Sequence, residues 1–424
     1  MKKYRARIAD RLLQSKLEGK GAVLVEGAKW CGKTTTAEQL AKSVLYLADP
    51  EFSRQYLDMA AIHPSHLLAG NTPRLLDEWQ LAPQLWDAIR FEVDHREEWG
   101  QFILTGSAVP PVTNEIHHTG TGRIARLKMR PMSLFESGES NGSVSLHSLF
   151  MEGVSIVGDS HLALEELAYL VCRGGWPVTT EMRPSVALEQ AFDYCDAVVH
   201  SDISRVDHVA RNPERVKRLM QSYARLQGTQ AATTVIRTDM LANDNSSLDE
   251  DTVQAYIGAL KQIFVIEDMP AWKPNLRSKT AIRTSDTRYY SDPSIATASL
   301  GLGPNDLMAD LNTFGLLFET LCIRDLRVYA DACNGQVYHY RDASGLECDA
   351  VVHLRNGSYG LVEIKLGGER LIEEGVSSLS KLADRIDTTH MKNPSFKMVL
   401  TATGEYAYRR KDGILVVPVA CLRD

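Results

Sequence analysis

The sequence predicts an α/β protein built from three parts, and three observations carry that prediction. The stretch GAKWCGKT at residues 27–34 lies between the apolar run AVLV and a helical pattern. Amphipathic helical patterns follow between residues 160 and 300. Beyond residue 305 the chain predicts a helix, three strands, a helix and a further strand. We therefore expect domains at residues 1–140, 160–300 and 305–424.

Length and composition are those of a globular protein with more than one core. The 424 residues exceed what one core usually holds, which predicts about two or three domains. The start, MKKYRARIADRLL, lacks the uninterrupted apolar core of a signal peptide, and no later run approaches the ~18 apolar residues of a membrane span. The seven cysteines show no CxxC pair, which predicts reduced thiols. We expect a cytoplasmic protein with no membrane segment.

Residues 27–34 fit the pattern G-x-x-x-x-G-K-[ST] of a loop that cradles phosphates. A buried strand is predicted before it at residues 22–25, and a helix after it at residues 34–45. Lys33 is expected to reach the β and γ phosphates, and the Thr34 hydroxyl to bind Mg²⁺. The predicted cofactors are therefore ATP and Mg²⁺, with ATP or ADP held by Gly27, Ala28, Lys29, Trp30, Cys31, Gly32, Lys33, Thr34, Thr35 and Ser107.

Two further segments supply the polar groups that such a loop needs. PRLLDEWQ, residues 73–80, predicts a strand that ends in Asp77, a second magnesium ligand, and Glu78, which would orient and deprotonate the attacking water. QFILTGSA, residues 101–108, predicts another strand, whose Thr105 and Ser107 are placed to sense the γ-phosphate or the water. Thr, Gly and Ser at a strand end can also serve the turn alone.

These segments, with HTGTGRIARLKMRPMSLFESG at 118–138, RGGWP at 173–177 and the later EIK, resemble a known family. The chain looks like the bacterial and archaeal AAA-type ATP-binding proteins that carry a C-terminal domain of unknown function 4143, over nearly its whole length. The resemblance implies a homo-oligomer with shared ATP sites, in which Arg123 reaches the nucleotide of a neighbouring subunit. Arg126 is the alternative, and a surface arginine on a helix end is the other reading.

The middle third predicts a loop, ESGESNGSVSLHS at residues 136–148, and then helices. One helix stops at Gly174, and another has Asn212 as N-cap before Pro213. A third, from residue 251, is followed by the hairpin-like FVIEDMPAW, and together they predict a winged-helix-like module.

The net charge of −7 restricts any nucleic-acid contact to local basic patches. Two clusters of basic residues predict either contact with DNA or RNA, or packing between domains or subunits. They are Arg211, Arg215, Lys217 and Arg218, and Lys273, Arg277, Lys279 and Arg283.

GLECDAVVHLRNGSYGLVEIKLGG, residues 345–368, predicts two paired strands joined by a tight turn. Side chains alternate along a strand, so Glu363 and Lys365 are expected on one face, with Asp349 across from them. Glu347, one alternate position earlier, is the other candidate acid. This D, E-x-K spacing resembles the restriction-endonuclease-like core, PD-(D/E)XK.

That second resemblance implies a fold and an activity. Glu319, in the helix predicted at residues 314–326, matches the helix acid of the resembling proteins. A metal held by Glu319, Asp349 and Glu363, with Lys365 beside it, would cleave a phosphodiester, and Asp349, Glu363 and Lys365 would be the catalytic residues. The alternative is a regulatory ATP switch whose inactive nuclease-like fold only binds a partner, because such folds frequently lose activity.

The sequence thus predicts a P-loop ATPase (AAA-type) domain, a winged-helix-like middle module and a PD-(D/E)XK nuclease-like domain. We expect ATP hydrolysis coupled to a domain that acts on or binds nucleic acid. A small-molecule kinase is disfavoured, since no segment looks like a lid over an acceptor substrate.

Overall fold

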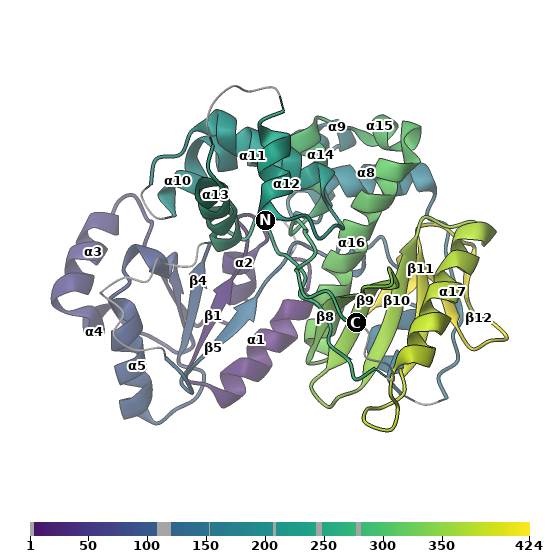
Figure 1. Cartoon of the computed structure of the whole chain (residues 1–424). Coiled ribbons are helices and arrows are strands. Elements are labelled where there is room, and N and C mark those ends of the chain that lie inside the picture. The colour runs from purple at the N-terminus through teal and green to yellow at the C-terminus, as the bar shows by residue number, and fades with distance from the viewer. Residues whose placement is uncertain (1–3, 108–119, 152, 207–208, 243–247, 277–280) are drawn as a thin grey trace. The chain divides into compact units, whose positions relative to one another are not determined.

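The computed structural model describes residues 4–107, 120–151, 153–206, 209–242, 248–276 and 281–424 (Figure 1). The chain forms two compact units. The first unit comprises Met1–Pro131, His200–Arg211 and Gly258–Val265, and the second comprises Met132–Val199, Asn212–Ile257 and Ile266–Asp424.

A five-stranded parallel sheet organises the first unit, in the order β2-β3-β4-β1-β5. Its strands are β1 (Ala22–Glu26), β2 (Ser43–Tyr46), β3 (Arg74–Asp77), β4 (Phe102–Gly106) and β5 (Ile124–Lys128). The helices of this unit include α1 (Ile8–Gly19), α2 (Lys33–Glu38), α3 (Ser53–Ile62), α4 (Pro64–Leu67) and α5 (Leu85–Arg96). A short 3₁₀ helix, Trp79–Leu81, follows β3.

Both faces of this sheet are buried. Val23 and Val25 of β1 pack in one apolar cluster with Leu13 of α1, while Leu24 packs in a second with Ile89 of α5. A parallel sheet covered on both faces leaves its strand ends as the place for polar groups. In parallel sheets of this kind, ligands bind at the carboxyl ends of the strands, at the point where the strand order breaks. Here the order β2-β3-β4 is broken at β1.

The helix predicted over residues 34–45 is wrong in its second half. Helix α2 ends at Glu38, and Ser43–Tyr46 form strand β2, paired with Arg74–Asp77. The run SVLY contains β-branched and aromatic residues that suit a pleated surface. Pairing with β3 satisfies their backbone groups, and local periodicity carries no information about that distant partner.

The second unit begins with elements where a loop is predicted. Residues 136–148 contain the end of α6 (Leu134–Ser137), strand β6 (Val144–Ser145) and most of α7 (Leu146–Leu149), so that prediction is wrong. Strand β6 pairs in parallel with β14 (Leu422–Arg423) near the chain's end. This pairing buries Val144 and explains why a segment rich in Ser and Gly is ordered.

Helices make up the middle of the chain. The predicted helix ends are confirmed at Gly174, which follows α8, and at Asn212, whose side chain accepts a hydrogen bond from the Arg215 N–H at the start of α11. The elements are α8 (Leu164–Arg173), α9 (Pro184–Ala197), a π-helix (Val198–Asp202), α10 (Ile203–Arg205), α11 (Pro213–Arg225), α12 (Thr233–Met240), α13 (Glu250–Gln262), α14 (Pro293–Leu300) and α15 (Pro304–Ala309).

The motif RGGWP packs against buried charges of the second unit. The Gly175 N–H donates to Asp292 at 3.0 Å, and Arg324 donates to the same carboxylate at 2.9 Å. A Cβ at Gly174 would lie 2.4 Å from Asp292, so the close approach requires glycine. The motif therefore serves packing.

A seven-stranded sheet, in the order β7-β12-β13-β11-β10-β9-β8, forms the C-terminal part. The predicted element order is confirmed: helix α16, strands β8, β9 and β10, helix α17 and strand β11 (Figure 1). These are α16 (Leu311–Ala332), β8 (Gly335–Arg341), β9 (Glu347–Leu354), β10 (Tyr359–Lys365), α17 (Glu369–Arg385) and β11 (Phe396–Thr401). The remaining strands are β7 (Gly158–Asp159), β12 (Tyr406–Arg409) and β13 (Leu415–Pro418). Within the described ranges, the helices are too short or too polar to span a bilayer.

Candidate functional site

The glycine-rich loop, residues 27–34, joins β1 to α2 at the carboxyl end of the parallel sheet. Gly27 has φ +156° and Gly32 φ +98°, in the region that favours glycine. A Cβ on Gly27 would lie 2.0 Å from the carbonyl oxygen of Met129. The two glycines therefore permit a tight path that other residues would obstruct.

An arginine that sequence reasoning missed holds this loop in place. The buried Arg7 guanidinium donates to the carbonyl of Cys31 at 2.8 Å and to the carbonyl of Arg130 at 2.8 Å. The Cys31 thiol lies 3.5 Å from the Met129 carbonyl. An arginine before a helix usually lies at the surface, so its sequence position gives no sign of this role.

Lys33 opens helix α2 and points back into the loop. Its buried ammonium donates to the carbonyls of Gly27 at 2.9 Å and Ala28 at 2.8 Å. An ammonium at the start of a helix and inside a glycine-rich loop presents positive charge where an anion would bind. The loop residues thus fit a phosphate group. Trp30 and Thr35, which are also predicted to contact the nucleotide, lie in the loop and in the first turn of α2.

The two predicted magnesium ligands are brought together. The Thr34 hydroxyl donates to Asp77 Oδ1 at 2.7 Å, and the Thr105 hydroxyl donates to the same oxygen at 2.6 Å. Strand β4 lies between β1 and β3, with Thr105 opposite Asp77, so three separate segments meet here. A hydroxyl and a carboxylate are the oxygen ligands that Mg²⁺ uses beside phosphates.

Glu78 directly follows β3 and has φ +55°, an uncommon conformation for a residue with a side chain. Its carboxylate accepts hydrogen bonds from the Gln80 amide and, at 3.3 Å, from the Ser107 hydroxyl. Backbone strain of this kind clusters at functional sites. Sequence reasoning placed Glu78 and Ser107 in the site but missed Gln80, whose position two residues later gave no distinct signal.

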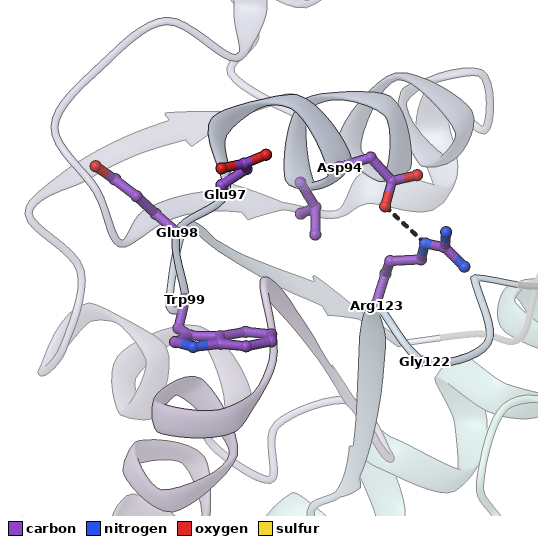
Figure 2. Close-up of a pocket in the computed structure, with 7 residues that line it drawn as sticks. Asp94, Glu97, Glu98, Trp99, Gly122 and Arg123 are labelled. Atoms are coloured by element: carbon purple, nitrogen blue, oxygen red, sulfur yellow. Dashed lines mark hydrogen bonds and ion pairs between the residues drawn. The ribbon is translucent and has the colours of Figure 1, made fainter.

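Arg123 lies at the amino ends of the parallel strands, opposite to the end that carries the glycine-rich loop. Ile124, the residue after it, pairs with Ala22 at the amino end of β1, whereas the loop follows its carboxyl end. Arg123 Nε donates to Asp94 Oδ1 at 2.7 Å, and this hydrogen bond holds the pKa of Asp94 below its usual value. Figure 2 shows this pair beside a pocket of about 380 Å³ that Trp99 also lines.

The alternative arginine, Arg126, is paired within the sheet. Its guanidinium lies 3.2 Å from Glu26 on the neighbouring strand. Neither arginine therefore reaches the glycine-rich loop of its own chain through a hydrogen bond among those the described residues make. This leaves the shared-site prediction dependent on a second subunit.

The basic residues proposed for nucleic acid divide into different environments. Arg211 is buried and donates to the Ile203 carbonyl at 2.8 Å, so its charge stabilises the chain locally. Arg277 and Lys279 lie outside the described residues.

In the C-terminal part, the predicted trio of Asp349, Glu363 and Lys365 is brought together. Lys365 Nζ lies 2.7 Å from Glu363 Oε2 and 3.1 Å from Asp349 Oδ2. Asp349 also accepts the Ile364 N–H at 2.7 Å. Glu347 lies 3.6 Å from Arg341 instead, with 55% of its side chain exposed, so Asp349 is the acid that faces the lysine.

Burial dominates the electrostatics of this trio. Burial and then the charge of Asp349 raise the pKa of Glu363 well above its usual value. Burial alone would lower the pKa of Lys365. The charges of Asp349 and Glu363 outweigh burial and raise this pKa above its usual value, so the lysine stays charged. Glu363 Oε1 is buried and has no hydrogen-bond partner among the described residues. Such a lone-pair site inside a protein is costly unless a proton or cation meets it.

Glu319 of α16 lies near the trio but is covered. The Tyr289 hydroxyl donates to Glu319 Oε1, and a Cβ on Gly228 would lie 3.1 Å from that oxygen. Burial, and then the Asp349 charge, raise the pKa of Glu319 to about 8. Where side chains are described, three or more His, Cys, Asp or Glu residues nowhere gather in an arrangement that would hold a metal. The donor chemistry of Asp349 and Glu363 fits a divalent cation, while their present partner is Lys365.

Comparison with family models divides the chain in three. An AAA domain model matches residues 19–137, a domain of unknown function 8612 matches 164–306, and a domain of unknown function 4143 matches 314–422. No curated protein matches.

Three solved structures are similar over much of the chain. The Walker-type ATPase paby2304 of Pyrococcus abyssi is 15% identical, with 68% of this chain and 94% of that chain covered and a TM-score of 0.43. The Aeropyrum pernix Orc1 protein in complex with DNA is 14% identical (73% and 95% covered, TM-score 0.23). A signal-transduction ATPase with numerous domains and a tetratricopeptide repeat sensor, from Pyrococcus horikoshii, is 12% identical (78% and 50% covered, TM-score 0.21).

Proposed function

We propose that this chain, an AAA-type ATP-binding protein with a C-terminal domain of unknown function 4143, hydrolyses ATP with Mg²⁺ at the glycine-rich loop. The observation that carries the proposal is the meeting of Thr34, Asp77 and Thr105 beside the buried Lys33. Calorimetry with ATP and ADP in Mg²⁺ tests it. Folded protein that binds neither nucleotide would overturn the proposal.

Each residue has a stated task in this reaction. Lys33 would leave the two loop carbonyls and bind the β and γ phosphates, while Thr34 and Asp77 would hold Mg²⁺, which neutralises phosphate charge. Glu78 would take a proton from the attacking water at its carboxylate. The Gln80 and Ser107 hydrogen bonds fix the position of that carboxylate.

We further propose that Arg123 completes the ATP site of a neighbouring subunit in a homo-oligomer. Its exposed position, away from its own loop, supports a task in trans. Arg123→Ala is expected to lower the hydrolysis rate about 10³-fold at protein concentrations where subunits associate. Phosphate release measured across a dilution series checks this. Arg54→Ala, an exposed arginine of α3 in the same unit, is the matched control. Unchanged turnover per subunit in Arg123→Ala at every concentration would exclude the shared site.

A second candidate function belongs to the C-terminal part: metal-dependent cleavage of DNA or RNA. The gathering of Asp349 and Glu363 around Lys365, with the orphan oxygen of Glu363, supports it. Asp349→Ala is expected to lower the rate of any cleavage with Mg²⁺ or Mn²⁺ about 10³-fold. Glu347→Ala, an exposed acid on the same strand, is the control. Cleavage that survives Asp349→Ala would place the chemistry elsewhere.

If no DNA or RNA substrate is cut with or without ATP, the regulatory switch is favoured. In that case the ATPase part changes state with its nucleotide, and the nuclease-like fold binds a partner. The antiparallel bridges Ile266–Tyr290 and Met269–Thr287, which follow helices α11 and α12, support a winged-helix-like module for that binding.

A further inference from the structure

A second lysine of the glycine-rich loop, Lys29, is paired with an acid far away in sequence. Lys29 Nζ lies 2.5 Å from Asp202 Oδ1, across a separation of 173 residues. The Asp202 side chain is only 9% exposed, whereas that of Lys29 is 41% exposed. A nearly buried carboxylate is therefore neutralised by a partly exposed ammonium of the loop.

Asp202 lies in an unusual segment. It is the last residue of the π-helix Val198–Asp202, and π-helical turns are rare and frequently mark functional sites. Residues 200–211 belong to the first compact unit, although the chain on either side of them belongs to the second. The ion pair thus attaches this short excursion of the chain to the glycine-rich loop.

The pair places two anions in competition for one cation. A triphosphate carries several negative charges, so an ammonium on the loop that meets it gains more than it does from one carboxylate. If Lys29 turns to the phosphates, Asp202 loses its partner while nearly buried. An unpaired buried charge is strongly unfavourable, so residues around Asp202 would have to move toward water.

We infer that Asp202 is a positioning residue that holds Lys29 when no nucleotide is bound and is released when nucleotide binds, so that the conformation of the segment 198–206 depends on nucleotide occupancy. This inference rests on the proposed ATP binding and adds a regulatory element to it. The predicted site residue Lys29 then has two alternative partners, and the segment that senses the exchange joins the two compact units in sequence.

A double-mutant cycle on the full chain tests the competition. Asp202→Asn frees Lys29 and is expected to tighten binding of a non-hydrolysable ATP analogue with Mg²⁺ about fivefold. Lys29→Met is expected to weaken it by a similar factor. In the Lys29→Met background, adding Asp202→Asn is expected to change nothing, because Asp202 acts only through Lys29. Asp196→Asn, an exposed acid of the preceding helix, is the matched control.

Hydrogen exchange gives a readout that a merely structural ion pair would not move. In wild-type protein, exchange over residues 198–206 is expected to rise when the analogue binds. In Asp202→Asn, whose neutral amide leaves no unpaired buried charge, exchange is expected not to change when the analogue binds. Lys29→Arg keeps the positive charge and is therefore expected to show the same rise in exchange as wild-type protein.

Two results would overturn the inference while ATP binding stands. One is that Asp202→Asn changes the affinity for the analogue equally with and without Lys29. The other is that hydrogen exchange over residues 198–206 of wild-type protein does not change when nucleotide binds. Wild-type protein without any calorimetric signal would instead remove the proposed function, and this inference with it.

Discussion

Glu78→Gln is expected to bind ATP with near-native affinity and to hydrolyse it about 10²–10⁴-fold more slowly. The amide keeps the shape of the side chain and its contacts with Gln80 and Ser107, but it accepts no proton from water. Lys33→Ala is expected to fail earlier, with at least tenfold weaker binding, because the ammonium inside the loop is lost.

Phosphate release and calorimetry on the same protein preparations separate the two variants. Glu51→Gln, an exposed acid of the same unit, is the control and should behave as wild type. Circular dichroism checks that Lys33→Ala is folded, since the Gly27 and Ala28 carbonyls lose a donor. If Glu78→Gln turned over as fast as wild type, the assignment of the general base would be wrong.

The elements around the phosphate loop were predictable because their signals are local. The strand Ala22–Glu26, the strand Arg74–Asp77 and the strand Phe102–Gly106 are short apolar runs that end in turn-forming or acidic residues. Strand β2 was not predictable in this way. Only residues 39–42 separate it from helix α2, and only pairing with β3, about thirty positions later, decides between helix and strand.

The same distinction applies to the site. Lys33, Thr34 and Asp77 stand in patterns that predict phosphate and Mg²⁺ binding, and the structure brings Thr34 and Asp77 into hydrogen-bond contact. Contacts that depend on the fold left no pattern: Arg7 reaches Cys31, and Asp202 reaches Lys29. No spacing rule links residues that lie in different elements, so their sequence positions carry no signal of the contact.

The C-terminal trio shows how far alternation alone goes. The two-residue alternation of side chains along a β-strand correctly predicted that Glu363 and Lys365 lie on one face. It did not separate Asp349 from Glu347, which share a face in the pattern; the structure does so, because Asp349 contacts Lys365 and Glu347 faces Arg341. It also gave no sign of Tyr289, which covers Glu319 from a segment thirty residues earlier in the chain.

Lys365→Met is expected to lower the free energy of unfolding by about 2–4 kcal/mol, because breaking a buried ion pair leaves uncompensated charge. The Glu363 side chain is 3% exposed and that of Asp349 15%, so water replaces the lysine poorly. Methionine keeps much of the side-chain length, and the loss therefore reports charge. Urea unfolding at pH 7 measures it, with Lys381→Met on the exposed face of α17 as control.

Divalent cations turn this variant into a test of the metal site. If Asp349 and Glu363 are metal ligands, Mg²⁺ or Mn²⁺ takes the place of the ammonium and restores a large part of the lost stability, since a ligand that binds only the folded state stabilises it by mass action. Wild-type protein, in which Lys365 already pairs with both acids, should respond less. A variant that stays destabilised at millimolar metal would show that the trio is a structural ion pair, and the proposed metal-dependent cleavage by the C-terminal part would then be excluded.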